Sequence, residues 1–162
     1  MSFRERTRRA NAGARFHLLA ALGIAASLAV IVAAQTLALG WRDPRQIGGL
    51  VALLSGAALP CTFAGSWLAD WIAPAETRRV AVWMLFVGGG TMGLGALIYA
   101  LIYRAGYAQW HDPIFTRGWL VQAVFTMAGA FYYWAVLAVR LIMPWAIVPL
   151  ALGALAFARR SR

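Results

Sequence analysis

The stretch Gln109-Trp110-His111-Asp112-Pro113 stands ahead of a long apolar run, and a shorter echo, Trp41-Arg42-Asp43-Pro44, stands ahead of another. In both copies Trp precedes Asp by two positions and Pro follows Asp at once. Asp accepts a hydrogen bond from a free N–H at a helix start, Pro fits the first helical position, and Trp prefers the lipid headgroup layer. The pattern predicts two helices that enter a membrane, with helix caps at Asp43, Pro44, Asp112 and Pro113.

The two copies align when the chain is shifted by 69 residues against itself, which also pairs Gly49 with Gly118. One interpretation is an ancient duplication of a two-helix hairpin. The other is that two helices entering from the same side each need an anchor, a cap and a proline. Little else matches at this offset, which favours the second interpretation.

The composition indicates an all-α integral membrane protein. Of the 162 residues, 62% are hydrophobic and only 12% are charged, whereas about a quarter of the residues of a soluble domain are charged. The net charge of +10 comes from arginines that bracket apolar runs, which favours contact with anionic lipid over nucleic acid. A single cysteine, Cys61, excludes an internal disulfide.

The apolar runs divide the chain into a basic N-terminal flank at residues 1–15, a single polytopic helical membrane domain at 16–158 and a basic tail at 159–162. About 20 apolar residues cross a bilayer core. We expect four transmembrane helices, at about 17–39, 47–69, 80–103 and 119–143.

The last apolar run, residues 119–158, is too long for one crossing. As one helix it would extend about 60 Å, twice the hydrocarbon core. Pro144 is the expected break, which leaves a short C-terminal helix at 144–158. This helix is re-entrant or interfacial, or it is a fifth crossing.

The distribution of arginines predicts the orientation. With a cytoplasmic N-terminus and four crossings, eleven arginines lie inside and four outside. A fifth crossing would make the split nearly even, so the positive-inside rule favours four. The predicted location is the bacterial cytoplasmic (inner) membrane, with several passes. The inner arginines are Arg4, Arg6, Arg8, Arg9, Arg15, Arg78, Arg79, Arg140, Arg159, Arg160 and Arg162.

Gly89, Gly93 and Ala96 form a strip of small residues in the third span. Such strips let membrane helices approach closely. The strip is predicted to pack against another helix, either within this chain or in another protein.

Groups able to do chemistry are sparse. No metal-ligand spacing, phosphate-binding loop or nucleophile elbow is present. We therefore expect no catalytic, cofactor-binding or metal-binding residues, and the chain is more consistent with a non-enzyme. An outer rim of Arg42, Arg45, Arg104, His111 and Arg117 could hold an anionic headgroup or substrate, or these side chains simply meet lipid phosphate.

An ion pair is expected at the inner boundary, between Asp70 and Arg140. Both residues fall near the inner end of a span that runs from outside to inside. Pairing would lower the cost of placing a charge near hydrocarbon. Glu76 is a rival partner, His17 a neighbour, and snorkelling of Arg140 into the headgroups the alternative.

Three functional classes follow from these features. The first is an accessory or assembly subunit that binds other membrane proteins or itself. The second is a small oligomeric transporter or channel subunit, suggested by Pro60 in the middle of the second span. The third is a lipid-modifying enzyme that uses His111 and Asp112.

Overall fold

The computed structural model describes residues 2–72, 75–107 and 112–160, without the side chains of Glu76 and Tyr107. In these ranges every regular element is a helix. The elements are α1 (Phe3–Ala12), α2 (Ala14–Ala38), α3 (Pro44–Ile72), α4 (Glu76–Met84), the π-helix η1 (Leu85–Gly90), α5 (Thr91–Tyr107), α6 (Arg117–Ile142) and α7 (Ile147–Arg160).

Four helical stretches are long and apolar enough to cross a membrane, namely Ala14–Ala38, Pro44–Ile72, Thr77–Gly106 and Arg117–Ile142. Each predicted span lies within about three residues of one of these stretches. The boundaries come from lengths of uncharged chain, and helix caps add residues beyond the apolar part.

The N-terminal flank is itself helical, which the charge pattern did not predict. The Ser2 side chain accepts a hydrogen bond from the N–H of Glu5, and the Glu5 carboxylate accepts one from the N–H of Ser2. This reciprocal capping box starts α1. The Glu5 pKa lies below its ordinary value, mainly because of the hydrogen bond from the Ser2 backbone.

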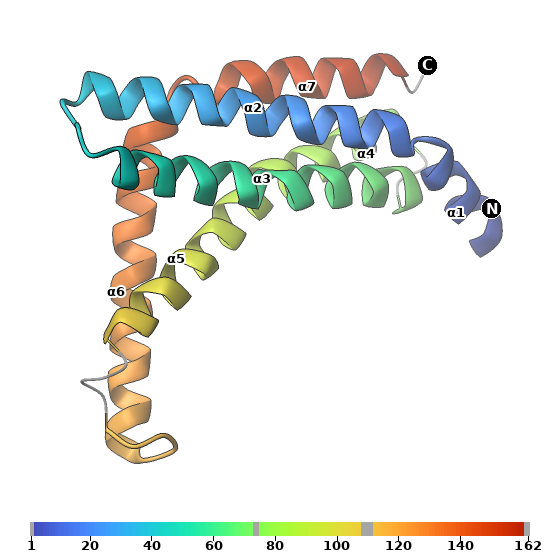
Figure 1. Ribbon diagram of the computed structural model, residues 1–162. Coiled ribbons are helices and arrows are strands. Elements are labelled where there is room, and N and C mark those ends of the chain that lie inside the picture. The colour runs from blue at the N-terminus through green and yellow to red at the C-terminus, as the bar shows by residue number, and fades with distance from the viewer. Residues whose placement is uncertain (1, 73–74, 108–111, 161–162) are drawn as a thin grey trace.

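Helices α2, α3, α4 and α7 form a body, and α5 and α6 form an arm that leaves it (Figure 1). Within the body α2 and α3 lie side by side and antiparallel, and α7 returns along α2 (Figure 1). Buried side chains from these helices and from α6 make one hydrophobic core, which includes Leu28, Leu54, Trp83, Leu141 and Phe157. The body therefore surrounds a shared core, whereas the lower part of the arm contributes little to it.

The third span is interrupted by a π-helix over Leu85–Gly90, which contains the glycine triplet. A π-turn adds one residue to the helical turn and is often found at functional sites. Gly90 faces Cys61 of α3, because a Cβ added at Gly90 would lie 3.4 Å from its sulfur. Cys61 is a free, half-buried cysteine.

Helix α6 runs at a steep angle to α2 and α3 (Figure 1). It contacts α5 through Trp134, whose indole N–H donates a 3.0 Å hydrogen bond to the carbonyl of Met92. Gly95 makes room for this ring, because a Cβ at that position would overlap it. After Ile142 the chain turns at Pro144, as expected, and α7 begins at Ile147.

Candidate functional site

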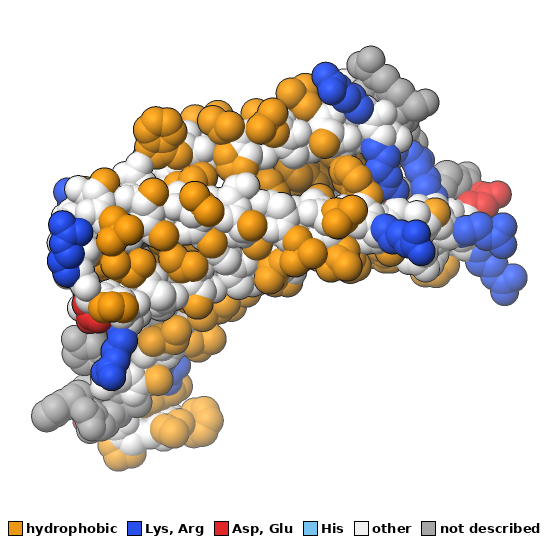
Figure 2. Space-filling view, turned by 45° about the horizontal axis from the view of Figure 1, so that its top comes forward, with side chains coloured by type: hydrophobic (Ala, Val, Ile, Leu, Met, Phe, Trp, Pro, Cys, Tyr) orange, Lys and Arg blue, Asp and Glu red, His pale blue; other side chains and the backbone are white. Residues whose placement is uncertain are grey.

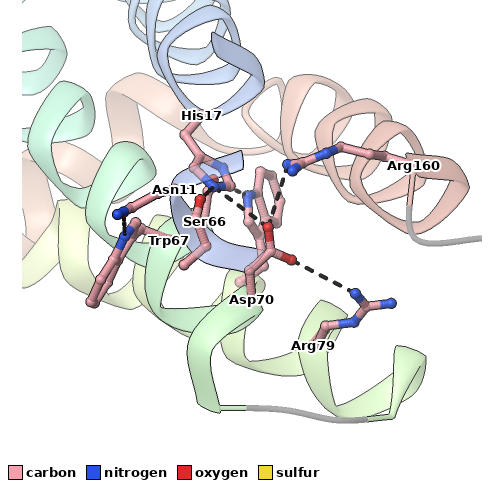
Figure 3. A network of polar contacts seen from close by, with 9 residues as sticks. Asn11, His17, Ser66, Trp67, Asp70, Arg79 and Arg160 are labelled. Atoms are coloured by element: carbon pink, nitrogen blue, oxygen red, sulfur yellow. Dashed lines mark hydrogen bonds and ion pairs between the residues drawn. The ribbon is translucent and has the colours of Figure 1, made fainter. Parts of the chain in front are cut away.

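Asp70, in the last turn of α3, is the centre of a buried polar cluster at one end of the body. Its residue is only 6% exposed. Its carboxylate lies 3.4 Å from Arg160 Nη1, 3.7 Å from Arg79 Nη1 and 3.5 Å from His17 Nε2 (Figure 3). Among the described residues Arg79 and Arg160 are its ion-pair partners and His17 is a polar neighbour, and we call the four residues the Asp70 cluster.

The Asp70 cluster joins four helices. His17 belongs to the first turns of α2, Asp70 to the end of α3, Arg79 to the start of α4 and Arg160 to the end of α7. A buried carboxylate without a partner would cost several kcal/mol. The cluster therefore fixes the ends of these helices against one another.

The prediction that Asp70 pairs with Arg140 is wrong. Arg140 is exposed on α6, and α6 meets the middle of α2, where Ile142 and Ile24 line one cavity. The bend at Pro144 therefore lies beside the middle of α2, and α7 carries the chain back to Asp70. Arg160, at the end of α7, takes the place that a full crossing by α6 would have given to Arg140.

His17 is fully buried and sits at the joint between α1 and α2. Its Nε2 lies 3.1 Å from the carbonyl oxygen of Ala10 as well as near Asp70. Its Nδ1 has no hydrogen-bond partner among the described residues. His17 was predicted as a neighbour of the ion pair, and the structure brings it into the Asp70 cluster.

Gly13 provides the space in which His17 and Arg160 meet. A Cβ added to Gly13 would overlap the Arg160 guanidinium and the His17 Nε2. The guanidinium also lies 4.8 Å from the centre of the Phe16 ring. A side chain at Gly13 would therefore displace the Arg160 guanidinium or the His17 ring from the place where they meet.

Aromatic side chains surround the Asp70 cluster. The Trp83 indole N–H donates to the Ser66 hydroxyl at 2.9 Å, and the Trp67 indole N–H donates to the Asn11 side-chain oxygen at 3.0 Å (Figure 3). Trp67 stacks on Trp71, with ring centroids 6.1 Å apart. Tryptophans with a bonded N–H are typical of the membrane–water boundary.

The predicted outer rim is not gathered into one surface. Arg42 and Arg45 flank the start of α3, whereas Arg117 begins α6 at the far end of the arm (Figure 1). Arg104 lies 4.7 Å from the centre of the Trp119 ring. His111 lies outside the described residues. The contact of Arg104 is thus with an aromatic ring of α6 and not with another residue of the predicted rim.

The two Trp-x-Asp-Pro turns differ in structure. The Asp43 carboxylate accepts a 2.9 Å hydrogen bond from the N–H of Arg45, and α3 begins at Pro44. Helix α6 begins later, at Arg117, where Thr116 is the cap and accepts a 3.1 Å hydrogen bond from the N–H of Trp119. The predicted caps Asp112 and Pro113 are thus corrected to Thr116, because a turn separates them from the helix.

The glycines of the third span have two roles. A Cβ at Gly95 would overlap Trp134, so Gly95 packs within the chain. Gly93 is exposed, and a Cβ there would meet no atom within 4 Å. Gly89 is also exposed, and its nearest neighbour is Leu85 of the same helix. Ala96 is 6% exposed and belongs to the core. Of the predicted strip, Ala96 therefore packs within the chain, whereas Gly89 and Gly93 are exposed.

The partners of Asp70 could have been found in part from the sequence. Arg79 follows Asp70 across a short connector, and adjacent helix ends are close in space. Arg160 could not be found in this way, because its position depends on where the bend at Pro144 lies along α2, and no local sequence pattern encodes that. Among the described residues no group of three His, Cys, Asp or Glu side chains could hold a metal ion.

Comparison with protein-family models, with curated proteins and with solved structures finds no match for this chain.

Proposed function

We propose that this protein is an accessory subunit of a membrane complex and that it binds a helix of another membrane protein. The supporting observation is an uncovered face on η1 and α5. Side chains four residues apart along this face are all exposed, and we call them the glycine face: Leu85, Gly89, Gly93, Leu97 and Leu101.

The glycine face has the shape that membrane helices use to associate. The hydrophobic effect does not join helices in lipid, so close backbone approach and dispersion contacts must do so. Gly89 and Gly93 leave a stretch of this face without side chains, between Leu85 and Leu97, and we call this stretch the groove. No other part of the described chain fills this groove, because the space at Gly93 is open.

Helix α6 adds a second uncovered surface. Phe125 is 74% exposed, Tyr132 67% and Tyr133 57%. Of the 18 most apolar consecutive residues of this helix only 17% are buried, against 33% for the corresponding stretch of α2. An arm that leaves the body with two uncovered helices offers a partner more contact than a closed bundle does.

We also propose that the end with the Asp70 cluster faces the cytoplasm and that the membrane is the bacterial inner membrane. Arginines gather around the end of the body that carries α1, a further group of arginines lies at the opposite end, and many hydrophobic side chains lie on the surface between them (Figure 2). The start of α2 and the end of α7 share this end, because Arg160 touches Asp70 and Phe16. The positive-inside rule supports the proposal that this end faces the cytoplasm.

The test is to fill the groove. Gly93→Leu should reduce recovery of the native complex on blue-native gels of mildly solubilised membranes, with the amount of the chain unchanged. Gly56→Leu is the matched control, because Gly56 is also an exposed helix glycine with no atom within 4 Å of an added Cβ.

Photo-cross-linking identifies what the groove contacts. A photoreactive side chain at Leu97 or Leu101 should form an adduct with another protein, whereas one at Leu22 of α2 should not. Adducts only between copies of this chain, in a small homo-oligomer, would favour the transporter or channel class instead. Equal migration of the Gly93→Leu and native complexes would reject the glycine face as the docking surface.

A further inference from the structure

An apolar cavity of about 320 Å³ lies where the body meets the arm. Its walls come from α2, η1, α5, α6 and α7. Of the described residues that line it, Thr91 alone carries a polar side chain group. The volume is at the lower end of the range of about 300 to 1,000 Å³ typical of ligand sites.

The cavity has a buried floor and a mouth on the outer surface of the bundle. The floor includes Val87, Thr91 and Leu28, which are 3%, 4% and 6% exposed. The mouth lies at the bend between α6 and α7, where Met143 is 50% and Ile147 54% exposed. A molecule at the mouth can therefore extend inward between α6 and α7.

The π-helix and its glycines keep this space open. Gly88 lines the cavity, and a Cβ added there would find its nearest atom, in Leu150, at 3.9 Å. Protein interiors are close-packed, and an empty cavity loses the dispersion contacts of its walls. An apolar occupant would restore these contacts.

The surroundings of the mouth define the occupant. Thr91 is at the middle of the span Thr77–Gly106, so the cavity lies at the depth of the hydrocarbon core. A molecule that arrives there comes from the bilayer, and the lining offers it almost only apolar contacts. We propose that the cavity binds one acyl chain of a bilayer phospholipid, inserted between α6 and α7. This inference does not depend on the proposed partner.

The bound chain would contact the body and the arm together. Ile24 and Leu28 belong to α2, whereas Val139 and Ile142 belong to α6. The acyl chain would thus fill the space between α2 and α6 and contact both parts at the place where they meet.

The experiment is photolabelling of the full chain in nanodiscs made with phosphatidylcholine that carries a diazirine in one acyl chain. Mass spectrometry should find adducts on the floor residues Leu28, Val87 and Thr91. Gly88→Leu and Ala146→Phe should each lower these adducts roughly tenfold, because the new side chains occupy the cavity. Val136→Phe, on the exposed surface of α6, is the matched control and should leave them unchanged.

Two results would overturn the proposal. One is a set of floor adducts that persists in both filled variants, each shown by circular dichroism and gel filtration to be folded. The other is floor labelling by a free diazirine fatty acid but not by the phospholipid, which would assign the cavity to a free apolar molecule. If one filled variant does not fold, Ile147→Trp at the mouth provides the same measurement.

Discussion

Asp70 and Arg160 lie 3.4 Å apart, although one ends the second span and the other ends the last helix. Their contact closes the body, because it joins α7 to α3 next to the start of α2. It also means that α7 returns to the end from which α2 departs.

The Asp70–Arg160 contact should be energetically coupled. Asp70→Asn leaves the 5% exposed Arg79 facing a neutral group, and breaking a buried pair costs about 3 to 5 kcal/mol. Arg160→Gln should cost less, because its side chain is 30% exposed. The double variant should lose less than the sum by about 0.5 to 3 kcal/mol in unfolding in mixed micelles. Arg140→Gln is the control and should change stability by at most about 0.5 kcal/mol. Strict additivity of the Asp70→Asn and Arg160→Gln effects in the double variant would contradict the contact.

Gly13→Ala should open the joint between α1 and α2. The added methyl overlaps the Arg160 guanidinium and the His17 ring, so one of them must leave the Asp70 cluster. We expect faster hydrogen exchange of the amides of α1 and α7, measured by mass spectrometry. Gly23→Ala, where no atom lies within 4 Å of an added Cβ, is the control; equal exchange in the two variants would mean that Gly13 has no such role.

Ser66→Ala should destabilise the body more than its size suggests. The substitution leaves the fully buried Trp83 indole N–H without its 2.9 Å acceptor, and an unsatisfied buried donor costs about 1 to 3 kcal/mol. Ser27→Ala removes only a bond from a serine to the carbonyl of Gly23 in its own helix, so its effect should be small. Thermal unfolding followed by tryptophan fluorescence compares the two, and the prediction fails if their midpoints coincide.

The start of α1 should loosen in acid. The Glu5 carboxylate has a pKa below its ordinary value, mainly through its hydrogen bond with the Ser2 N–H. The stabilisation is complete above the pKa of the unfolded chain and is lost as the pH falls through the lowered pKa of the folded state. Amide exchange at Thr7 and Arg8, corrected for intrinsic rates, should therefore lose protection in that range. The Glu5→Gln variant should lack this pH dependence, and an identical profile in both chains would rule out the carboxylate as its source.

Accessibility from the two sides of the membrane tests the orientation. In a Cys61→Ser background, Arg8→Cys and Arg159→Cys should both resist a membrane-impermeant maleimide in intact cells, because α1 and the end of α7 share one end of the body. Ile114→Cys, which is 67% exposed at the tip of the arm, should react. Reaction at Arg8→Cys alone would separate the two ends and contradict the fold.

The sequence predicted the spans well because their signal is local. In lipid, the backbone N–H and C=O groups of about 20 uncharged residues can be hydrogen-bonded within the segment only if it is a helix. Pro144 has no N–H to donate to the preceding turn, so α6 ends before it. The glycine strip was also visible in the sequence. Which of its residues face outward was not, because this depends on the extra residue in the helical turn of η1 and on the fit of Gly95 to Trp134.

The site was predicted only in part. Asp70 and His17 were expected at one boundary, and both belong to the cluster. Arg140 was expected there because each span was taken to cross the full bilayer in line with the others. The depth of a bend and the angle of a helix are set by contacts between distant residues, so the replacement of Arg140 by Arg160 could not be found from hydropathy.

Because Arg160 lies near the end of the chain, its contact with Asp70 can form only late in synthesis. Ribosomes add about 5 to 20 residues per second, so Arg160 emerges on the order of five to twenty seconds after Asp70. During that interval α4 is made, and Arg79 is the guanidinium of the cluster that Asp70 can meet before Arg160. The body therefore closes only after α7 has been made, and a chain stalled before α7 would leave the Asp70 carboxylate without its Arg160 contact.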